Sequence, residues 1–469
     1  MKVIKIGGGC LSGGDTISDI MDLLSSHGRG NVIVVSALYG VTDKLLEGMH
    51  KALTDEGAIP GQITGLRDLH LQTLERLVQE PAHRTATMAT VDAQLKQLER
   101  YYYGLSFTAE CTPRIKDLIA SVGERLCAHL LCGVMQARGT KAICCPPEEI
   151  GLITDGKYGD ATVNLPKTRR NFSNELRPRL ENDTLTFIPG FYGISKSGEI
   201  TTFGRGGSDY AAAVAAAALD AEMLEIWKDT RGFMSADPQV VPAAMLIPTL
   251  SYAEAAELAY FGARILHPRT VEPVRGKKIP IAIKHTLDPD GPHSVIHSRS
   301  SRRRQVIKSV AYARDIGVLK VHASGVGARP GILAQVAGAV SAKGVNIKSV
   351  VTSQTCISLL LARDDVKRAR DGLQACRPRP YRRIDVVTDI ALISIVGEGL
   401  LHRQGIAAQC FTAVAACNVN VEMISFGPSP AALYFLCREK DLEAGVTAIH
   451  STFFGAPSCL LSGAGGDQR

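Results

Sequence analysis

The sequence feature that most constrains the fold is the stretch from Phe203 to Pro238. A glycine-rich loop around Arg205 leads into Ser208 and Asp209, and an alanine-rich segment typical of a helix is followed by a short apolar strand. Glycines let backbone N–H groups crowd a ligand, and the N-terminal end of a helix attracts anions. The pattern predicts a site for a phosphorylated ligand beside a carboxylate-bearing one. A tight turn with Asp209 as a helix cap explains the same residues equally well.

A second glycine loop follows the first predicted strand, KVIKI, which contains Lys5. Gly7, Gly8 and Gly9 come directly after this strand, and a helix is predicted beyond them. The loop is not a Walker A motif, because no Gly-Lys-Ser/Thr ends it. A lysine in a buried parallel strand is unusual unless its amine reaches a ligand or partner at the strand end. We therefore predict that Lys5 contacts a ligand; the alternative is an edge-strand lysine that points at water.

Strands alternate with helices over almost 300 residues, which predicts an α/β sandwich on a mostly parallel sheet. Ser36 and Thr42 lie just past the second strand, at the edge where open α/β sheets bind ligands, although hydroxyls in such loops are more often turn formers. Glu124 lies in an otherwise apolar helix. It could approach a ligand amine, or it could pair with Arg125 or His129.

The C-terminal third of the chain contains an internal repeat with an offset of 74 residues. Residues 331–335 (GILAQ) recur as residues 405–409 (GIAAQ), and residues 345–347 (VNI) recur as residues 419–421 (VNV). Each copy reads as strand, glycine turn, amphipathic helix, asparagine turn and strand. Two copies are too few for a solenoid. They predict a pair of small α+β modules with a ligand site at their interface.

Charge and cysteine usage exclude several classes of protein. The net charge is +7, but few aromatic residues are interleaved with the arginine run at residues 302–304, which argues against a nucleic-acid surface. The 12 cysteines contain no CxxC pair, so we expect buried thiols in a reducing cytoplasm and no metal site. We expect no signal peptide, and the longest apolar run, residues 210–219, is too short to span a membrane.

The motifs, in their order along the chain, resemble those of aspartate kinase (aspartokinase). The strings that carry the resemblance are Lys5-Ile6-Gly7-Gly8, Gly123-Glu124-Arg125-Leu126, Phe203-Gly204-Arg205-Gly206-Gly207-Ser208-Asp209-Tyr210, Asp237-Pro238 and Leu266-His267-Pro268. The repeated tail resembles the two ACT domains of that family. The resemblance implies a three-layer α/β/α catalytic domain of the amino-acid-kinase fold over residues 1–298 and a basic linker over 299–315. It also implies ferredoxin-like ACT domains over 316–388 and 389–465, with the C-terminal segment returning to complete the first.

By this resemblance, the enzyme transfers the γ-phosphoryl group of ATP, with Mg²⁺, to the β-carboxylate of L-aspartate. The product is 4-phospho-L-aspartate, which feeds lysine, threonine and methionine biosynthesis. A homodimer or homotetramer in the cytoplasm is implied, with an amino-acid effector such as threonine or lysine at the ACT domains. The alternatives are another amino-acid kinase of the same fold and a non-catalytic amino-acid sensor.

The resemblance also assigns roles to residues. Lys5 would stabilise the transferring phosphoryl group and Asp209 would orient Lys5 or assist at the attacking carboxylate. The substrate-binding residues would be Ser36, Thr42, Glu124 (for the α-ammonium), Arg205 (for a carboxylate) and Ser208. The nucleotide-binding residues would be Gly7, Gly8, Gly9, Lys228, Asp229, Met234, Asp237 and Arg264. The effector-binding residues in the first ACT unit would be Gly331, Ile332, Asn346, Lys348, Ser353 and Gln354.

Several positions depart from the family pattern. Lys228 stands where threonine is usual, Met234 where tyrosine is usual and Arg264 where lysine is usual. Lys228 could add a phosphate contact or could face water. In the first ACT unit, Lys348 stands where lysine-sensing members carry aspartate. Because a cation there repels a lysine ammonium, we expect weak or absent lysine inhibition, with threonine or no effector instead.

Overall fold

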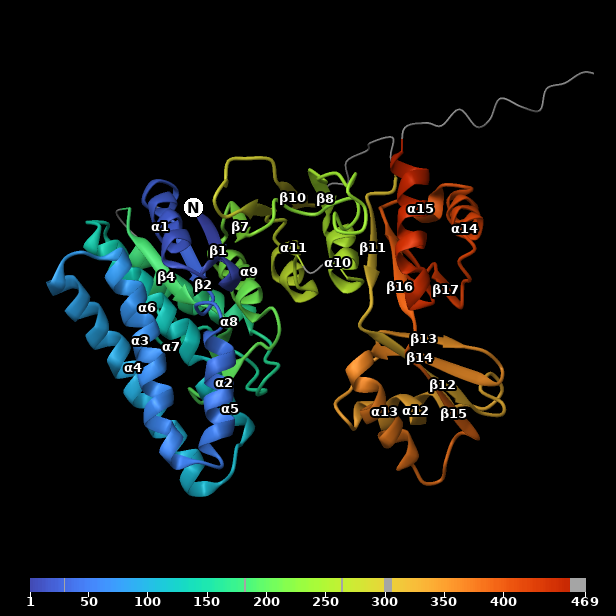
Figure 1. The fold of residues 1–469 in the computed structure, drawn as a ribbon, viewed down its shortest axis with the longest axis horizontal. Coiled ribbons are helices and arrows are strands. Elements are labelled where there is room, and N and C mark those ends of the chain that lie inside the picture. Colours follow the sequence, from blue (N-terminus) through green and yellow to red (C-terminus); the bar gives the residue numbers. More distant parts are fainter. Residues whose placement is uncertain (29, 181–182, 263–264, 299–305, 456–469) are drawn as a thin grey trace, which may run out of the picture. The chain divides into compact units, whose positions relative to one another are not determined.

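The computed structural model describes residues 1–28, 30–180, 183–262, 265–298 and 306–455, which form two compact units (Figure 1). The first unit comprises residues 1–233, 246–256 and 265–298. The second comprises residues 234–245, 257–262 and 306–455.

An eight-stranded sheet forms the centre of the first unit, in the order β3-β4-β2-β1-β7-β9-β10-β8. All neighbouring strands run parallel except β9 and β10, which are antiparallel. The strands are β1 (Lys2–Ile6), β2 (Val32–Val35), β3 (Ala142–Cys144), β4 (Leu185–Pro189), β7 (Met223–Lys228), β8 (Thr249–Ser251), β9 (Ile281–His285) and β10 (Ser294–His297). The sandwich on a mostly parallel sheet is therefore confirmed.

Helices cover both faces of this sheet. Ile4 and Ile6 of β1 pack into a core shared with α1 (Gly14–His27) and α6 (Val122–Ala137). Because successive side chains of a strand alternate between faces, Lys5 lies on the opposite face, where α9 (Gly207–Leu219) packs on β1, β2 and β7. The helices α2 (Val41–Ala52), α3 (Ile59–Leu77), α4 (Pro81–Thr108) and α5 (Pro113–Ala120) extend together beyond the sheet (Figure 1).

The alanine-rich composition of α9 has a packing reason. All 13 residues of this helix, Gly207–Leu219, are buried. Alanine side chains are small enough for the helix backbone to approach the sheet closely, and alanine has the best helix propensity. Residues Pro113–Ala137 form the one stretch among the described residues with the length and composition of a membrane span, and 83% of its apolar window is buried, as in a core helix.

The second unit contains two four-stranded antiparallel sheets, with strand orders β13-β14-β12-β15 and β11-β16-β18-β17. The first module consists of β12 (Ile316–His322), α12 (Ile332–Ser341), β13 (Ser349–Thr352), β14 (Cys356–Ala362), α13 (Val366–Gln374) and β15 (Arg383–Val387). The second consists of β11 (Ser309–Ala313), β16 (Ala391–Val396), α14 (Ile406–Ala416), β17 (Met423–Phe426), β18 (Ala432–Cys437) and α15 (Leu442–Phe454). The internal repeat therefore corresponds to two α+β modules.

The structure completes the two modules differently from the expectation. β15 pairs with β12 as an edge strand of the first module, and the last described element, α15, packs on β11 and β16 of the second module. β11, which lies inside the expected linker 299–315, pairs instead with β16 in the second module. The first module is therefore inserted between β11 and the rest of the second. The end of the expected C-terminal segment, residues 456–465, lies outside the described residues.

The boundary expected between residues 298 and 299 does not coincide with the division between the units, because residues 234–245 bind β11. The N–H of Val310 donates to the carbonyl of Ser235 at 2.8 Å. The hydroxyl of Tyr312 donates to Asp237 at 2.8 Å. A stretch that is contiguous with the catalytic motifs in sequence thus belongs to the second unit.

The close packing of α9 leads to a stability prediction. Replacing the buried Ala216 by leucine adds volume to a filled interface and should lower the free energy of unfolding by about 1–3 kcal/mol. Thermal unfolding of Ala216→Leu measures the effect, and Ala82→Leu, at an exposed position in the first turn of α4, is the matched control. Equal melting temperatures for the two variants would show that the interface between α9 and the sheet can accept a larger side chain, and would contradict the prediction.

Candidate active site

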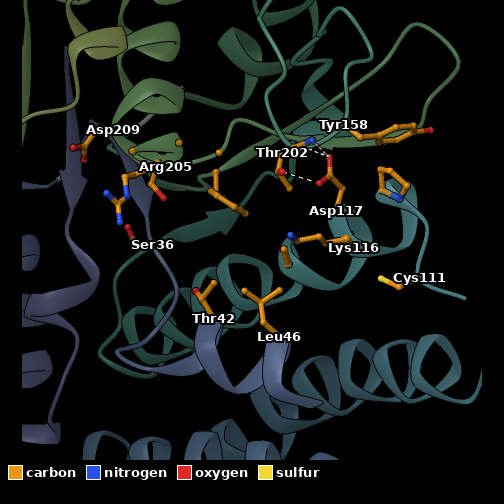
Figure 2. Close-up of a pocket in the computed structure, with 18 of the residues that line it drawn as sticks. Ser36, Thr42, Leu46, Cys111, Lys116, Asp117, Tyr158, Thr202, Arg205 and Asp209 are labelled. Carbon is orange, nitrogen blue, oxygen red and sulfur yellow. Dashed lines mark hydrogen bonds between the residues drawn. The ribbon is translucent and has the colours of Figure 1, made fainter. Parts of the chain in front are cut away.

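A cavity of about 690 Å³ lies within the first unit, where β1, α2, α5 and the N-terminal turn of α9 meet (Figure 2). Its lining includes six of the seven predicted catalytic and substrate-binding residues, namely Lys5, Ser36, Thr42, Arg205, Ser208 and Asp209. These residues are up to 204 positions apart in the sequence. The seventh, Glu124, lies behind Ser208, whose hydroxyl donates to the Glu124 carboxylate at 3.5 Å.

Lys5 and Asp209 form a buried ion pair at one end of the cavity. The ammonium of Lys5 lies 2.6 Å from Oδ1 of Asp209, and each side chain is 7% exposed. The ammonium of Lys228 lies 3.6 Å from Oδ2 of the same carboxylate. Burial opposes ionisation of Asp209, but Lys5 and Lys228 hold the pKa of its carboxyl below the usual range. The group is therefore a carboxylate between two ammonium groups.

Glu124 is a buried carboxyl group with unused hydrogen-bonding capacity. Burial raises its pKa to about 8, against the opposing effect of backbone N–H groups, including that of Ala37. Its Oε2 atom has no hydrogen-bond partner among the described residues. A buried polar atom without a partner calls for an explanation. A ligand ammonium beside Glu124 would satisfy that atom and favour the ionised form.

Arg205 lies exposed on the loop before α9. Gly204 and Gly206, on either side of it, both have φ near +72°, a conformation that favours glycine. A side chain on Gly206 would also come within 2.4 Å of His267. No carboxylate among the described residues forms an ion pair with Arg205, so its guanidinium is free to bind an anionic ligand in the cavity.

Asp117 of α5 supports the wall of this cavity, a role that the sequence analysis missed. Its carboxylate accepts hydrogen bonds from the N–H and hydroxyl of Thr202, both at 2.8 Å, and from the N–H of Gly159 at 2.9 Å (Figure 2). Asp117 thereby ties the helix that leads to Glu124 to the strand that leads to Arg205. The only sequence signal was an acidic residue on the apolar side of a short helix.

Arg269 is a second supporting residue that was missed. Its guanidinium donates to the carbonyls of Phe203 at 3.0 Å and Ala161 at 2.7 Å, and to the carboxylate of Asp160 at 2.9 Å. It also lies 4.6 Å from the ring centroid of Tyr210, close enough for a cation–π interaction. Nothing in the sequence connects residue 269 with residues 160 and 203, because only the fold makes them neighbours.

The predicted nucleotide-binding residues are divided between the units. Gly7, Gly8 and Gly9 form a turn after β1, where the Gly7 N–H donates to the carbonyl of Trp227 at 3.1 Å and a side chain on Gly9 would meet nothing within 4 Å. Lys228 and the exposed Asp229 end β7 in the first unit. Met234 and Asp237 belong to the second unit, and Arg264 lies outside the described residues.

The predicted effector residues all lie in the first module of the second unit. They are Gly331 at the N-cap of α12, Ile332 at its first position, and Asn346, Lys348, Ser353 and Gln354 around β13. Lys348 is half-buried against Tyr260 of α10 (Tyr252–Tyr260). The Tyr260 hydroxyl donates to the Lys348 carbonyl at 2.7 Å, and the Lys348 ammonium lies 5.6 Å from the Tyr260 ring centroid.

The buried Glu124 leads to a prediction about pH. The folded protein retains a proton that the unfolded chain, with a glutamate pKa of about 4.3, releases, so this group makes unfolding easier as pH rises towards 8. Glu124→Gln should abolish this loss, which amounts to up to about 3 kcal/mol between about pH 5.5 and about pH 8. Denaturant unfolding across this range measures the difference from wild type. Glu175→Gln, at an exposed site, is the control, and parallel curves for wild type and Glu124→Gln would contradict the prediction.

Comparisons with known proteins agree with the predicted family. Residues 1–285 match the amino acid kinase family and residues 393–453 match an ACT domain. Aspartokinase 2 of Arabidopsis thaliana, a chloroplastic enzyme, is 30% identical, with 96% of this chain and 84% of the relative covered. Lysine-sensitive aspartokinase 3 of Escherichia coli is 28% identical, with 96% and 99% covered.

A solved structure extends this agreement to the fold. The structure of E. coli aspartokinase III in complex with aspartate and ADP superposes with a TM-score of 0.82 at 26% identity, covering 97% of this chain and 100% of the other. The family match spans more than half of the chain, and the relatives match it from end to end. The chain therefore belongs to the aspartokinases of the amino acid kinase family.

Proposed function

We propose that this protein transfers the γ-phosphoryl group of ATP to the β-carboxylate of L-aspartate, giving 4-phospho-L-aspartate and ADP as the first step of the aspartate-family pathway. The observation that carries the proposal is a cavity lined by a free guanidinium and a lysine–aspartate pair, with a buried carboxyl that has an unsatisfied oxygen next to the lining residue Ser208. These groups complement an amino acid that has a second carboxylate.

The substrate-binding roles follow from charge and position. Arg205 binds a carboxylate of aspartate, in the bidentate geometry that guanidinium groups favour. Glu124 receives the α-ammonium, which supplies a partner for Oε2. The positive charge of the ammonium favours the ionised form of this raised-pKa carboxyl, whose proton is released to water. Ser36, Thr42 and Ser208 donate hydroxyl hydrogen bonds to the remaining substrate oxygens. The neighbour from E. coli, which was solved with aspartate and ADP, supports this choice of substrates.

The transfer itself requires positioning and charge neutralisation more than covalent chemistry. A β-carboxylate oxygen attacks the γ-phosphorus, and the bond to the oxygen that bridges the β- and γ-phosphorus atoms breaks, with its electron pair leaving on ADP. No general base is needed, because the attacking carboxylate is already ionised at neutral pH. Lys5 stabilises the negative charge on the transferring group, and Asp209 orients the Lys5 ammonium. The N–H groups of Gly8 and Gly9 donate to the same oxygens, since the Gly7 N–H is already bonded to the Trp227 carbonyl.

We assign nucleotide contacts in the first unit to Gly7, Gly8, Gly9 and Asp229. The nucleotide-binding roles of Met234, Asp237 and Arg264 stay predictions. Among the described residues, no group of three or more histidine, cysteine, aspartate or glutamate side chains could hold a metal ion. A Mg²⁺ ion coordinated mainly by phosphates and water needs no such group, so these residues fit a metal that arrives with ATP. When bound, the ion would neutralise phosphate charge.

The kinase assignment is tested by ATP-dependent turnover with L-aspartate, with the acyl phosphate trapped by hydroxylamine. We expect Lys5→Ala to reduce kcat roughly 100-fold or more, because it removes the cation at the transferring group. Arg205→Ala should raise KM for aspartate about tenfold or more, because a charged hydrogen bond is lost. Lys96→Ala, at an exposed position of α4, should behave as wild type.

Two outcomes of this assay would redirect the proposal. Faster turnover with L-glutamate than with L-aspartate would indicate another amino-acid kinase of the same fold. Absence of turnover, together with a thermal shift on adding an amino acid, would indicate a non-catalytic sensor. The charged residues Lys5, Arg205 and Asp209 in one cavity, with the Glu124 carboxyl next to its lining residue Ser208, favour catalysis over both alternatives.

We further propose that the first ACT module, through the residues around β13, binds an effector other than lysine. Lysine binds a related enzyme, E. coli aspartokinase III, in its T-state. In this chain the Lys348 ammonium lies against Tyr260 and would repel a lysine side chain. Threonine carries no second ammonium and meets no such repulsion. We place the enzyme in the cytoplasm as a homodimer or homotetramer, with no nucleic-acid or membrane partner.

The regulatory proposal predicts that L-lysine inhibits wild type weakly. Replacing Lys348 by aspartate should increase lysine sensitivity by at least about fivefold, since reversing the charge changes the interaction by roughly 1 kcal/mol or more. The measurement is inhibition of hydroxamate formation over a lysine titration, with Lys343→Asp, at an exposed site in the same module, as the control. Strong lysine inhibition of wild type would contradict the proposal.

A further inference from the structure

Lys228, at the end of β7, is largely shielded from solvent. Its side chain is 18% exposed, and its ammonium donates a short hydrogen bond to the carbonyl of Ile265. The same ammonium lies 3.6 Å from Oδ2 of Asp209. A buried ammonium is costly unless it is paired and hydrogen-bonded, and these two contacts supply both requirements.

Strand register explains why Lys228 reaches the same carboxylate as Lys5. Lys5 of β1 is directly opposite Ile226 of β7, and the two strands run parallel. Lys228 is two residues beyond Ile226, so its side chain lies on the same face of the sheet as that of Lys5. The first turn of α9 brings Asp209 onto that face, between the two ammonium groups.

Asp209 interacts with the ammonium groups of both Lys5 and Lys228, and this shared pairing affects how Lys5 can reach the phosphoryl group. Lys5, held 2.6 Å from Oδ1, is partly neutralised until it turns towards an incoming phosphate. If Lys5 were the only partner of Asp209, that turn would leave a buried carboxylate without a counter-ion, which is costly. Lys228 keeps Asp209 paired while Lys5 moves.

We propose that Lys228 is a positioning residue for the reaction, which holds Asp209 in place and thereby releases the Lys5 ammonium to the transferring phosphoryl group. This inference rests on the proposed function. It differs from the simpler idea that Lys228 contacts the nucleotide, because the Ile265 carbonyl and Asp209 both hold its ammonium at the sheet. The family usually has threonine at the position of Lys228, so the proposed role is specific to this chain.

The charged groups around Lys228 give the proposal a signature in the pH profile. Lys228 interacts electrostatically with four groups: Lys5 on β1, Asp209 on α9, Asp229 directly after β7 and the Cys10 thiol after β1. Burial lowers the pKa of Lys228, and Lys5 lowers it further, which together outweigh the opposing effect of Asp209. Lys228 therefore loses its proton at a lower pH than an ordinary lysine. In a plot of kcat against pH, kcat should fall at alkaline pH as Lys228 loses this proton.

The test compares Lys228→Gln with wild type and with the control Lys96→Gln in the hydroxamate assay. We expect kcat to fall roughly ten- to hundredfold, while KM for ATP and for aspartate changes by less than about threefold. The alkaline limb that Lys228 gives to the wild-type kcat profile should be absent in Lys228→Gln. Lys228→Arg, which keeps the charge, should retain more of kcat than Lys228→Gln and should also lack the wild-type limb.

Three results would overturn the inference. A raised KM for ATP with unchanged kcat would make Lys228 a direct nucleotide contact. Unchanged kcat and KM would leave it without a part in the reaction. The same alkaline limb in wild type and both variants would show that another group titrates there.

A measurement without substrate separates this inference from the proposed function. If the wild-type protein is inactive, the proposed function is overturned. The effect of Lys228 on the pairing between Lys5 and Asp209 is then tested by acetylation of Lys5 with acetic anhydride, followed by mass spectrometry. Without Lys228, Asp209 binds Lys5 alone, so Lys5 should be acetylated more slowly in Lys228→Gln than in wild type at the same pH. Equal rates, in variants whose thermal unfolding shows that they are folded, would overturn the inference.

Discussion

The ion pair between Lys5 and Asp209 is the interaction on which the rest of the first unit depends. It forms inside the protein, where an unpaired partner of either sign would be strongly unfavourable. The pair requires α9 to lie close to β1, and the alanine-rich, fully buried α9 permits this approach. Strand order places β1 at the centre of the sheet, between β2 and β7, so Lys5 lies where loops from both sides of the strand can surround a ligand.

The loop that carries Arg205, a proposed substrate-binding residue, is held in place by side chains from other segments. Arg205 lies on a loop between two left-handed glycines, and such a loop has no stiffness of its own. Asp117 fixes the strand that enters this loop, and Arg269 fixes the carbonyl of Phe203 at its start. Buried hydrogen bonds to charged groups are the strongest available for this purpose. The orientation of the guanidinium therefore depends on side chains from α5 and from the segment after α10.

The sequence predicted the α/β sandwich and the paired modules from periodicity and an internal repeat. It also predicted six residues of the cavity lining, from short motifs and from the family resemblance. It did not predict the support from Asp117 or Arg269, since single polar residues in helices or turns carry no signal of their distant partners. It also did not predict that Met234 and Asp237 lie in a different compact unit from Lys228 and Asp229. Contiguity in sequence suggested one nucleotide loop, but hydrogen bonds to β11 decide where the later residues belong.

The chemical groups and the elements that carry them follow from local sequence: the lysine in β1, the Arg205 loop, the acidic start of α9 and the duplicated modules. Local patterns specify these features, because secondary structure depends on nearby residues. Only the tertiary structure decided the charge state and pairing of these groups. Glu124 holds its proton because the fold buries it, and Lys228 lies beside Asp209 because β7 is the parallel neighbour of β1. Burial and strand order depend on residues far apart in the chain, so neither can be deduced from a local motif.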